Sequence, residues 1–185
     1  MNPVGAATAG AADVVSFWRD AGADKWFAKD PEFDRLFGER FLDLHMLIAQ
    51  RGRDEWMTSA AGCLALILLT DQFPRNVFRG TAHMYATDPL ARLYAREAEA
   101  AGCWGGVDLE LRSFLALPFM HSEDLSDQDH SVRLAERLGE PFLKYAMRHC
   151  DVIRRFGRFP HRNAMLARAT TAEEARFLAG GGFAG

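Results

Sequence analysis

The sequence predicts an all-α protein, and three observations carry this prediction. Apolar residues recur at helical spacing, as in Phe33, Phe37, Phe41, Leu44 and Ile48. Asp-Pro pairs and glycines mark helix starts and stops along the chain. No run alternates between apolar and polar residues for more than a few positions, so no strand is expected. About eight or nine helices with short connections indicate antiparallel pairs, arranged as a bundle or as a short stack of helical hairpins.

The expected helices follow the chain at residues 14–22, 30–52, 55–72, 88–102, 108–118, 122–139, 140–157 and 171–180. Asp13 and Asp30 are the expected N-caps of the first two, and Pro31 occupies the first helical position of the second. The third helix is apolar on every side over "CLALILL", which predicts a buried central element. We expect Phe73-Pro74 to stop it, because the residue before a proline avoids helical dihedral angles.

Helix ends in the second half follow the same rules. Pro118 is expected to end the fifth helix. Ser122 is the expected N-cap of the next helix, with Glu123 in its first turn, where acidic side chains favour the helix dipole. Thr171 and Glu174 have the spacing of a capping box, which predicts the start of the last helix.

Length and composition are those of one ordinary globular domain. The chain has 185 residues, of which 49% are hydrophobic and 25% are charged. A chain of this size buries roughly 70% of the surface that its unfolded form exposes. No linker is visible, so we expect a single domain over residues 1–185, with flexible ends at 1–12 and 180–185. An apolar helix face left over by an incomplete stack could form a homodimer.

Charge is unevenly distributed along the chain. The formal net charge is -3, whereas nucleic-acid binders normally carry a basic excess, so nucleic acid is not an expected partner. Acids predominate from Glu123 to Glu140, and bases predominate from Lys144 to Arg168. Two oppositely charged helix faces that pair with each other are the simplest interpretation. On the helix at 140–157, the side chains expected to be exposed are Lys144, Arg148, Asp151 and Arg155.

The cysteines and the apolar segments bear on location. Cys63, Cys103 and Cys150 are odd in number and far apart, which argues against a disulfide framework and a zinc knuckle. Cys63 lies in an apolar run typical of a core. The start, "MNPVGAATAGAA", lacks the basic and apolar regions of a secretory signal, and the longest apolar stretch, residues 60–69, is too short to span a bilayer. We therefore expect a cytoplasmic protein without membrane contact.

Chemistry-bearing side chains gather in three stretches at expected helix junctions: "TDQFPRNVFRG", "PFMHSEDLSDQDH" and "RFGRFPHRN". The first and third share Phe-Pro followed by Arg-Asn. The usual nucleotide-binding, zinc-protease and serine-hydrolase motifs are missing, so no cofactor is predicted. His121, Glu123 and His161 do not have a known metal spacing, so no metal is predicted either. The residues expected to bind a ligand are Gln72, Arg75, Asn76, Arg79, Arg158, Arg162 and Asn163.

Three interpretations of these stretches remain open. In the first, the arginines and asparagines only bond helix ends and acids, as capping devices do. In the second, the junctions meet at one end of the fold and arginine forks hold an anionic small molecule or peptide, which makes the protein a helical binding module. In the third, the protein is a hydrolase- or transferase-type enzyme with a histidine as acid or base and a carboxylate orienting it. The catalytic candidates are His121, Glu123, His161 and Asp71.

Three longer motifs carry a family resemblance. "LILLTDQFPRNVFRGTAHMYATDPLA", "LPFMHSEDLSDQ" and "RFGRFPHRNAMLAR" follow one another over most of the chain, which resembles a bacterial family of unknown function, number 924 among such families. The resemblance implies a compact, all-helical, right-handed superhelix like those of the tetratricopeptide-repeat superfamily, and it supplies no reaction. Relatives usually carry Leu-Gly-Arg where this chain has Leu166-Ala167-Arg168. If that glycine needs a positive φ, this chain must turn differently there.

Overall fold

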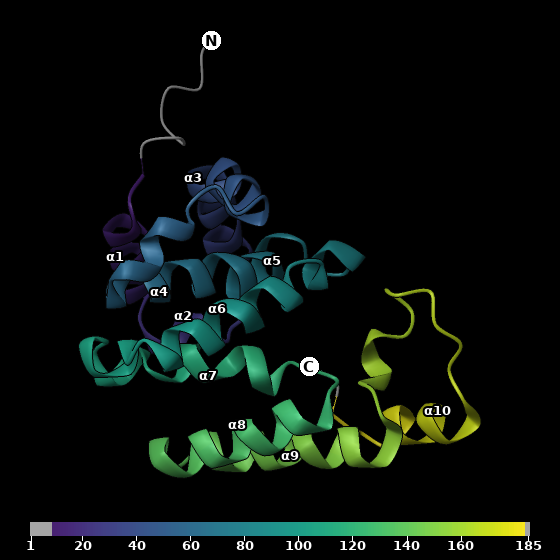
Figure 1. Cartoon of the computed structure of the whole chain (residues 1–185). Helices are drawn as coiled ribbons and strands as arrows, with labels where there is room; N and C mark the ends of the chain where they lie inside the picture. Colours follow the sequence, from purple (N-terminus) through teal and green to yellow (C-terminus); the bar gives the residue numbers. More distant parts are fainter. Residues whose placement is uncertain (1–8, 184–185) are drawn as a thin grey trace. The chain divides into compact units, whose positions relative to one another are not determined.

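The computed structural model describes residues 9–183, and every regular element within them is helical (Figure 1). The predicted all-α class is therefore confirmed, whereas the right-handed superhelix stays a prediction. The chain divides into two compact units, residues 1–115 and 116–185. Of the ends expected to be flexible, 1–8 and 184–185 lie outside the described residues. Ala11 and Ala12 belong to the first helix.

Unit 1 consists of α-helices joined by short 3₁₀ turns. Its α-helices are α1 (Ala11–Ala21), α2 (Ala23–Trp26), α3 (Pro31–Ala49), α4 (Ala60–Ile67), α5 (Phe73–Val77) and α6 (Asp88–Ala100). Its 3₁₀ turns are η1 (Asp54–Thr58), η3 (Ala82–Tyr85), η4 (Cys103–Gly106) and η5 (Leu109–Leu111). The chain passes from unit 1 into unit 2 within α7 (Ser113–Met120).

Helix α4 is the centre of unit 1, as its apolar sequence predicted. Leu64 and Leu66 are at most 1% exposed, and α1, α6 and η1 all contact this helix. Aromatic rings fill the space beside it, with Phe37 5.5 Å from Trp18 and 4.9 Å from Phe73 between ring centroids. Although α4 is strongly apolar, no helix in the described part of the chain has the length and the apolar run needed to cross a membrane.

The central helix does not stop at Phe73-Pro74, so that prediction is wrong. Leu68–Gln72 form a π-helical turn, labelled η2, and α5 continues directly from Phe73. The backbone N–H of Phe73 donates to the carbonyl of Leu68, which is the five-residue spacing of a π-helix. Since a π-turn is wider than an α-turn, it leaves room for the ring of Pro74 that an α-helix interior would not.

Three other helix ends differ from the predictions. Gly10 is the N-cap of α1, and Asp13, at the third helical position, accepts the Gly10 N–H at 2.8 Å. Pro118 lies inside α7, where it removes only one main-chain hydrogen bond. The N-cap of α8 is Asp124 instead of Ser122, because the Asp124 carboxylate reaches the second N–H of the helix. The predicted caps that the structure confirms are Asp30 with Pro31, and Thr171 with Glu174.

Unit 2 begins as a helical hairpin of α8 (Leu125–Leu138) and α9 (Phe142–Phe156), followed by η6 (Pro160–Arg162) and α10 (Ala172–Ala179). Figure 1 shows α8 and α9 side by side. The inner face of α9 buries Ala146, Cys150 and Ile153, while Phe142 is only partly buried, and Lys144, Arg148, Asp151 and Arg155 are exposed as predicted. The side chains that complete this core are Val152, Phe159, Phe156, Phe177 and Phe183.

Candidate binding site

The π-turn in unit 1 needs hydrogen-bond donors from other elements. Residue 74 would donate to the carbonyl of Leu69 in a π-helix and to the carbonyl of Thr70 in an α-helix. Residue 74 is a proline and has no N–H, so neither carbonyl receives this hydrogen bond. The Nδ1 atom of His45 lies 2.8 Å from the Leu69 oxygen, and the Thr87 hydroxyl donates to the Thr70 oxygen at 2.6 Å. Both side chains are buried. Sequence reasoning missed them, because a missing donor does not indicate which distant residue replaces it.

The first predicted arginine is enclosed by carboxylates. Arg75 donates to both oxygens of Asp88, at 2.8 and 3.1 Å, and lies 3.1 Å from Asp71. It also donates to the main-chain oxygen of Asp71, one turn earlier, at 2.8 Å. Burial disfavours the Arg75 charge, but the two carboxylates outweigh it and raise the pKa of Arg75. Gln72 donates to the second oxygen of Asp71 at 2.6 Å, so the first motif forms a buried network.

The other two predicted residues of this motif differ from each other. Arg79 donates to both oxygens of Asp34, at 2.7 and 3.3 Å, and to the carbonyl of Ala28 at 3.1 Å. Asn76 is 5% exposed, and its Nδ2 has no hydrogen-bond partner among residues 9–183. Arg79 therefore ties α3 to the end of α5, whereas the Asn76 amide nitrogen ties no described element.

In unit 2, Glu123 is held by an arginine that sequence reasoning did not select. Arg168 donates to both carboxylate oxygens of Glu123, at 2.6 and 3.0 Å, and to the carbonyl of Phe159 at 3.1 Å. The N–H of Phe159 donates to Glu123 at 2.8 Å. Burial opposes the charge of Glu123, but these donors lower its pKa. Arg168 stands at the end of the third motif, so its place in "HRNAMLAR" was the signal that could have found it.

A second carboxylate–arginine lock joins the third motif to α10. Arg158 donates to both oxygens of Glu174, at 2.6 and 2.9 Å. Glu174 also accepts the backbone N–H of Thr171 at 2.7 Å, and Asn163 Nδ2 lies within 3.3 Å of it. The Glu174 residue is 2% exposed. The hydrogen bonds from Arg158, followed by that from Thr171, lower the pKa of Glu174 to about 2.

The Arg158–Glu174 pair predicts that the protein loses stability in acid. Glu174 has a folded pKa of about 2 against an ordinary value of 4.5, so its stabilising effect is present above pH 4.5 and is lost as the pH falls toward 2. Glu174→Gln should therefore lower the melting temperature at pH 7 and flatten its decline between these values. Circular dichroism melts at stepped pH measure both effects. Glu173→Gln, at the exposed neighbouring position, is the matched control and should keep the wild-type slope; an equal slope in all three proteins would contradict the prediction.

The predicted histidines lie beside an arginine and a group of aromatic rings. Arg162 donates to the carbonyl of His121 at 2.9 Å and its guanidinium lies 4.5 Å from the centroid of Phe159. His161 lies against Phe159 at 5.6 Å, and its buried Nδ1 has no hydrogen-bond partner within the described chain. Burial and then the charge of Arg162 lower the pKa of His161 to about 4. His161 is therefore neutral at pH 7.

The third motif closes with a left-handed residue. Ala167 has φ 52°, so this alanine adopts the left-handed conformation that usually favours glycine. This conformation costs an L-residue about 1–2 kcal/mol. The turn lets the Arg168 N–H donate to the carbonyl of Asn163 at 2.8 Å. Its cost is offset by the bonds that Arg168 then makes to Glu123.

The predicted site residues are thus divided between the units. Unit 1 holds Asp71, Gln72, Arg75, Asn76 and Arg79; unit 2 holds His121, Glu123, Arg158, His161, Arg162 and Asn163. Within unit 1, Asp71, Gln72 and Arg75 contact one another, and within unit 2, Arg158 and Asn163 share Glu174. No group of three or more histidine, cysteine, aspartate or glutamate side chains among residues 9–183 is arranged to hold a metal ion.

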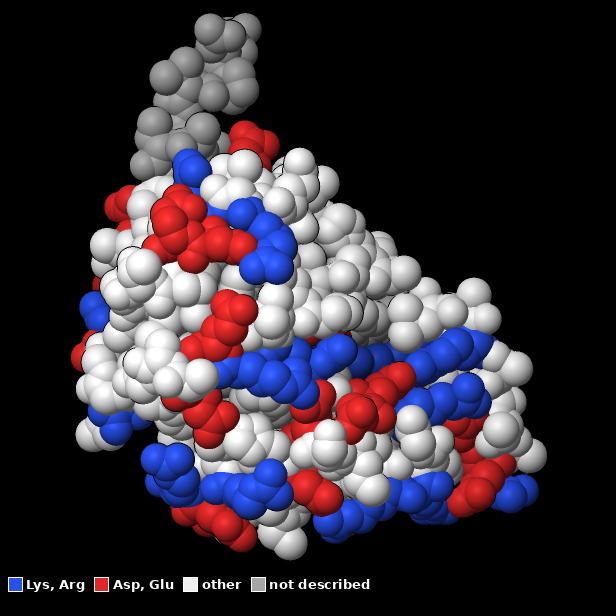
Figure 2. All heavy atoms as spheres, in the orientation of Figure 1, with Lys and Arg blue, Asp and Glu red and all other residues white. Residues whose placement is uncertain are grey.

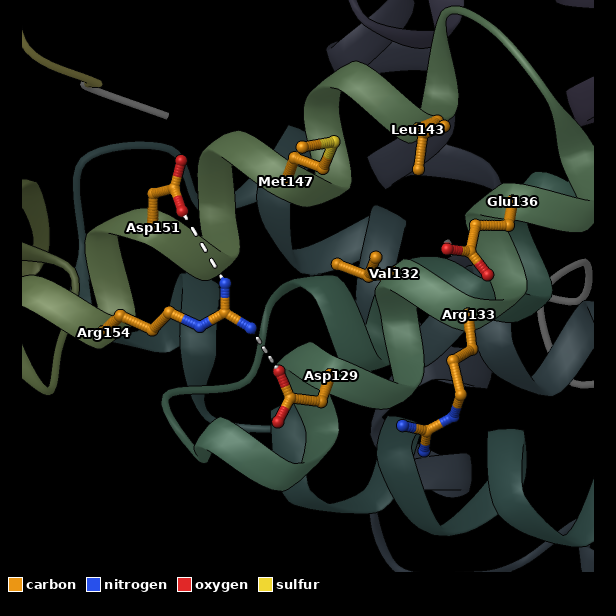
Figure 3. Close-up of a pocket in the computed structure, with 8 residues that line it drawn as sticks. All are labelled: Asp129, Val132, Arg133, Glu136, Leu143, Met147, Asp151 and Arg154. Atoms are coloured by element: carbon orange, nitrogen blue, oxygen red, sulfur yellow. Dashed lines mark hydrogen bonds and ion pairs between the residues drawn. The ribbon is translucent and has the colours of Figure 1, made fainter.

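A hollow lies on the α8–α9 hairpin, away from the three motifs. It has a volume of about 370 Å³, and Val132, Leu143 and Met147 form its apolar part. Figure 3 shows Arg154 reaching from α9 toward Asp129 of α8 and toward Asp151, with distances of 2.8 and 3.9 Å. The cationic group at this end of the hollow is therefore already compensated.

A larger groove runs along α9 to α10 and has a volume of about 650 Å³. Met147 lines both this groove and the α8–α9 hollow and is 52% exposed. In the view of Figure 2, Lys and Arg lie beside Asp and Glu in the region where Figure 1 draws α8, α9 and α10. The apolar residues of the α9–α10 groove are Met147, Val152, Phe156, Phe177 and Phe183, its cationic residues are Lys144, Arg148 and Arg155, and its acidic residues are Glu140 and Asp151.

These features define an all-helical protein whose junction motifs are tied into ion pairs. The chain belongs to the family described as bacterial protein of unknown function (DUF924), which matches residues 14–182, so the predicted resemblance is confirmed. Among solved structures it is similar to the protein of unknown function ATU0120 from Agrobacterium tumefaciens. That similarity has 54% sequence identity and a TM-score of 0.89, and covers 91% of this chain and 96% of that chain. No curated protein matches.

Proposed function

We propose that this protein is a helical binding protein whose ligand is an acidic peptide with apolar side chains, held in the α9–α10 groove. The volume of about 650 Å³ is in the range of ligand-binding clefts. Both helices belong to unit 2, so the proposal needs no second copy of the chain. A cytoplasmic location remains part of the proposal, and the free state of Cys63, Cys103 and Cys150 supports it.

The observation that carries the proposal is a pair of cations, each without an ion pair among the described residues, beside an apolar surface. Lys144 and Arg148 stand one turn apart on α9, and neither has a carboxylate partner among the described residues. The third cation of the groove, Arg155, lies 3.0 Å from Glu173. A carboxylate ligand would supply the missing charge, while its apolar side chains would cover rings such as Phe183, over which Arg148 lies at 5.3 Å.

The arginines that were predicted to bind a ligand are better explained as members of ion pairs within the protein. Arg75, Arg79 and Arg158 each hold a carboxylate with two hydrogen bonds. Binding an external anion there would require breaking a bidentate pair inside the protein, which leaves a charge without its partner. We therefore infer that the junction motifs stabilise helix ends. The ligand would instead bind Lys144 and Arg148 on α9.

The enzymatic alternative receives less support. A general acid or base works best when its pKa lies near the working pH. The pKa of His161 is about 4, and burial, followed by the charge of a neighbouring histidine, lowers that of His149 to about 3. Glu123 is bonded to Arg168 and to the Phe159 N–H, so its oxygens are occupied by donors other than a histidine.

Fluorescence anisotropy with a labelled peptide that alternates glutamate with leucine or phenylalanine tests the proposal. We expect saturable binding at low salt that weakens as salt is added, and no binding of a peptide with lysine in place of glutamate. Replacing both Lys144 and Arg148 by alanine should weaken binding about tenfold or more. Circular dichroism melts would first show whether the double variant is as stable as the wild type.

Arg137→Ala is the matched control, because Arg137 is an exposed α8 cation that lines neither hollow. It should leave the affinity unchanged. Equal affinity of the double variant and the wild type would overturn the proposed site. Binding of citrate in place of the peptide, with the same dependence on Lys144 and Arg148, would overturn the peptide and leave a small anion as the ligand.

A further inference from the structure

Two cysteines that are 40 residues apart in the sequence meet in unit 1. The Sγ atoms of Cys63, on α4, and Cys103, on η4, are 2.6 Å apart. Such thiols are closer than ordinary van der Waals contact allows, while a disulfide bond measures about 2.05 Å. Neither side chain takes part in the groove on α9 and α10, so whatever this pair does is separate from the proposed peptide binding.

Main-chain packing brings the two sulfur atoms together. A Cβ at Gly106 would lie 2.7 Å from the Cβ of Ala60, so η4 can approach the start of α4 this closely only with glycine at that position. The thiol of Cys63 is oriented by the carbonyl of Met57, 3.5 Å away. The meeting of Cys63 and Cys103 therefore follows from how η4 and α4 pack and does not depend on the side chains alone.

We propose that Cys63 and Cys103 are a modification site, at which low-molecular-weight disulfides oxidise the two thiols to an intramolecular disulfide. Cys63 is fully buried and Cys103 is 8% exposed, so the oxidant meets Cys103 first. The Cys103 sulfur attacks one sulfur of the small disulfide, forms a mixed disulfide and releases one small thiol. The Cys63 sulfur then attacks the Cys103 sulfur and releases the second small thiol. The protein loses two hydrogen atoms, which the two released thiols carry.

Closure should be slow because of the surroundings of Cys63. Burial, together with the neighbouring Cys103, raises the pKa of the Cys63 thiol to about 12. The attacking species in thiol–disulfide exchange is the thiolate, which is scarce for such a group at neutral pH. The pair is therefore suited to a lasting cross-link between η4 and α4, and not to rapid catalysis of exchange.

The test uses the full chain with oxidised glutathione as the probe. After prolonged incubation, titration should find one free thiol instead of three, and mass spectrometry of the unreduced digest should find the Cys63 and Cys103 peptides joined. The melting temperature should rise by on the order of 10 °C, because the cross-link restricts the unfolded chain. Reduction should restore three thiols and the original melting temperature.

Two variants separate the outcomes. Cys150→Ser removes the third thiol, which lies in unit 2, and should still lose two thiols and gain the same stability. Cys103→Ser should form no internal cross-link and show no rise in melting temperature. The proposal is overturned if the wild type keeps all three thiols, or if it stops at a mixed disulfide with glutathione. A joined pair that includes Cys150 would overturn it as well.

Discussion

Arg75→Ala is expected to lower the free energy of unfolding by about 3–5 kcal/mol, which is the range for removing one partner of a buried ion pair. The side chain of Arg75 is 12% exposed, and its partners Asp71 and Asp88 are 1% and 9% exposed. The variant leaves two carboxylates in a poorly hydrated place, where the charged form is disfavoured. Urea unfolding at pH 7, monitored by circular dichroism, measures the loss.

The pH dependence of this variant has a definite sign. Without Arg75, no guanidinium offsets the cost of keeping two buried carboxylates charged, so adding a proton to this site would favour the folded state of the variant. The deficit relative to wild type should therefore shrink as the pH falls from 7 toward 4. Arg35→Ala is the matched control, because Arg35 also bonds two carboxylates but is 51% exposed, and exposed pairs contribute little. A loss for Arg75→Ala no larger than for this control would contradict the buried network.

Gly62→Ala is expected to cost about 2–4 kcal/mol, through overpacking and the loss of a helix cap. A Cβ at Gly62 would lie 1.9 Å from the carbonyl oxygen of Trp56 in η1, a distance that no relaxation of a side chain can relieve. It would also lie 2.9 Å from the Ser59 hydroxyl, which caps α4 by accepting the Gly62 N–H. Either η1 moves away or the first turn of α4 opens.

Gly105→Ala is the comparison for this effect, because a Cβ at Gly105 meets no heavy atom within 4 Å. It should change the free energy of unfolding by no more than about 0.5 kcal/mol, as surface substitutions usually do. Chemical denaturation of both variants under the same conditions gives the two values. If Gly62→Ala were as stable as Gly105→Ala, the close approach of η1 to α4 would be wrong.

The loss expected for Gly62→Ala concerns the same part of unit 1 as the cysteine pair. η1 and η4 both contact α4 near its start, and each needs a glycine, Gly62 or Gly106, where the backbones approach. A cross-link between Cys63 and Cys103 would fasten one of these contacts. The Arg75 network lies at the other end of the same helical run, beyond the π-turn, so the two ends of the central helix are held by different physical means.

The candidate site was predictable in part. The three motifs do contain the side chains that form buried networks, and "RFGRFPHRN" does join the acids Glu123 and Glu174, through Phe159 and Arg158. The residue types alone left open whether an arginine fork holds a ligand or a carboxylate of the same chain, because both are the same chemistry. The tertiary structure favours a carboxylate of the same chain, because it places Asp88 within hydrogen-bond distance of Arg75.

Other features were beyond any local pattern. His45 on α3 and Thr87 directly before α6 bond the Leu69 and Thr70 carbonyls within the π-turn, and neither lies within one helical turn of Pro74 in the sequence. The cations of the α9–α10 groove were predicted to be exposed, but the groove exists only because the rings of Phe177 and Phe183 fold back against α9. A period of hydrophobic residues indicates which face of one helix is buried and cannot indicate what lies opposite.

By itself, the sequence determined the helical class of this protein, the buried central helix and the caps at Asp30 and Thr171, because these depend on spacing and on residues within one turn of each other. The tertiary structure decided what lies beyond that range. It decided that the helix continues past Pro74, that Arg168 completes the Glu123 pair, and that Cys63 meets Cys103. The physical reason is that a donor, a charge or a thiol is satisfied by whatever group folding brings near, and that group can stand anywhere in the chain.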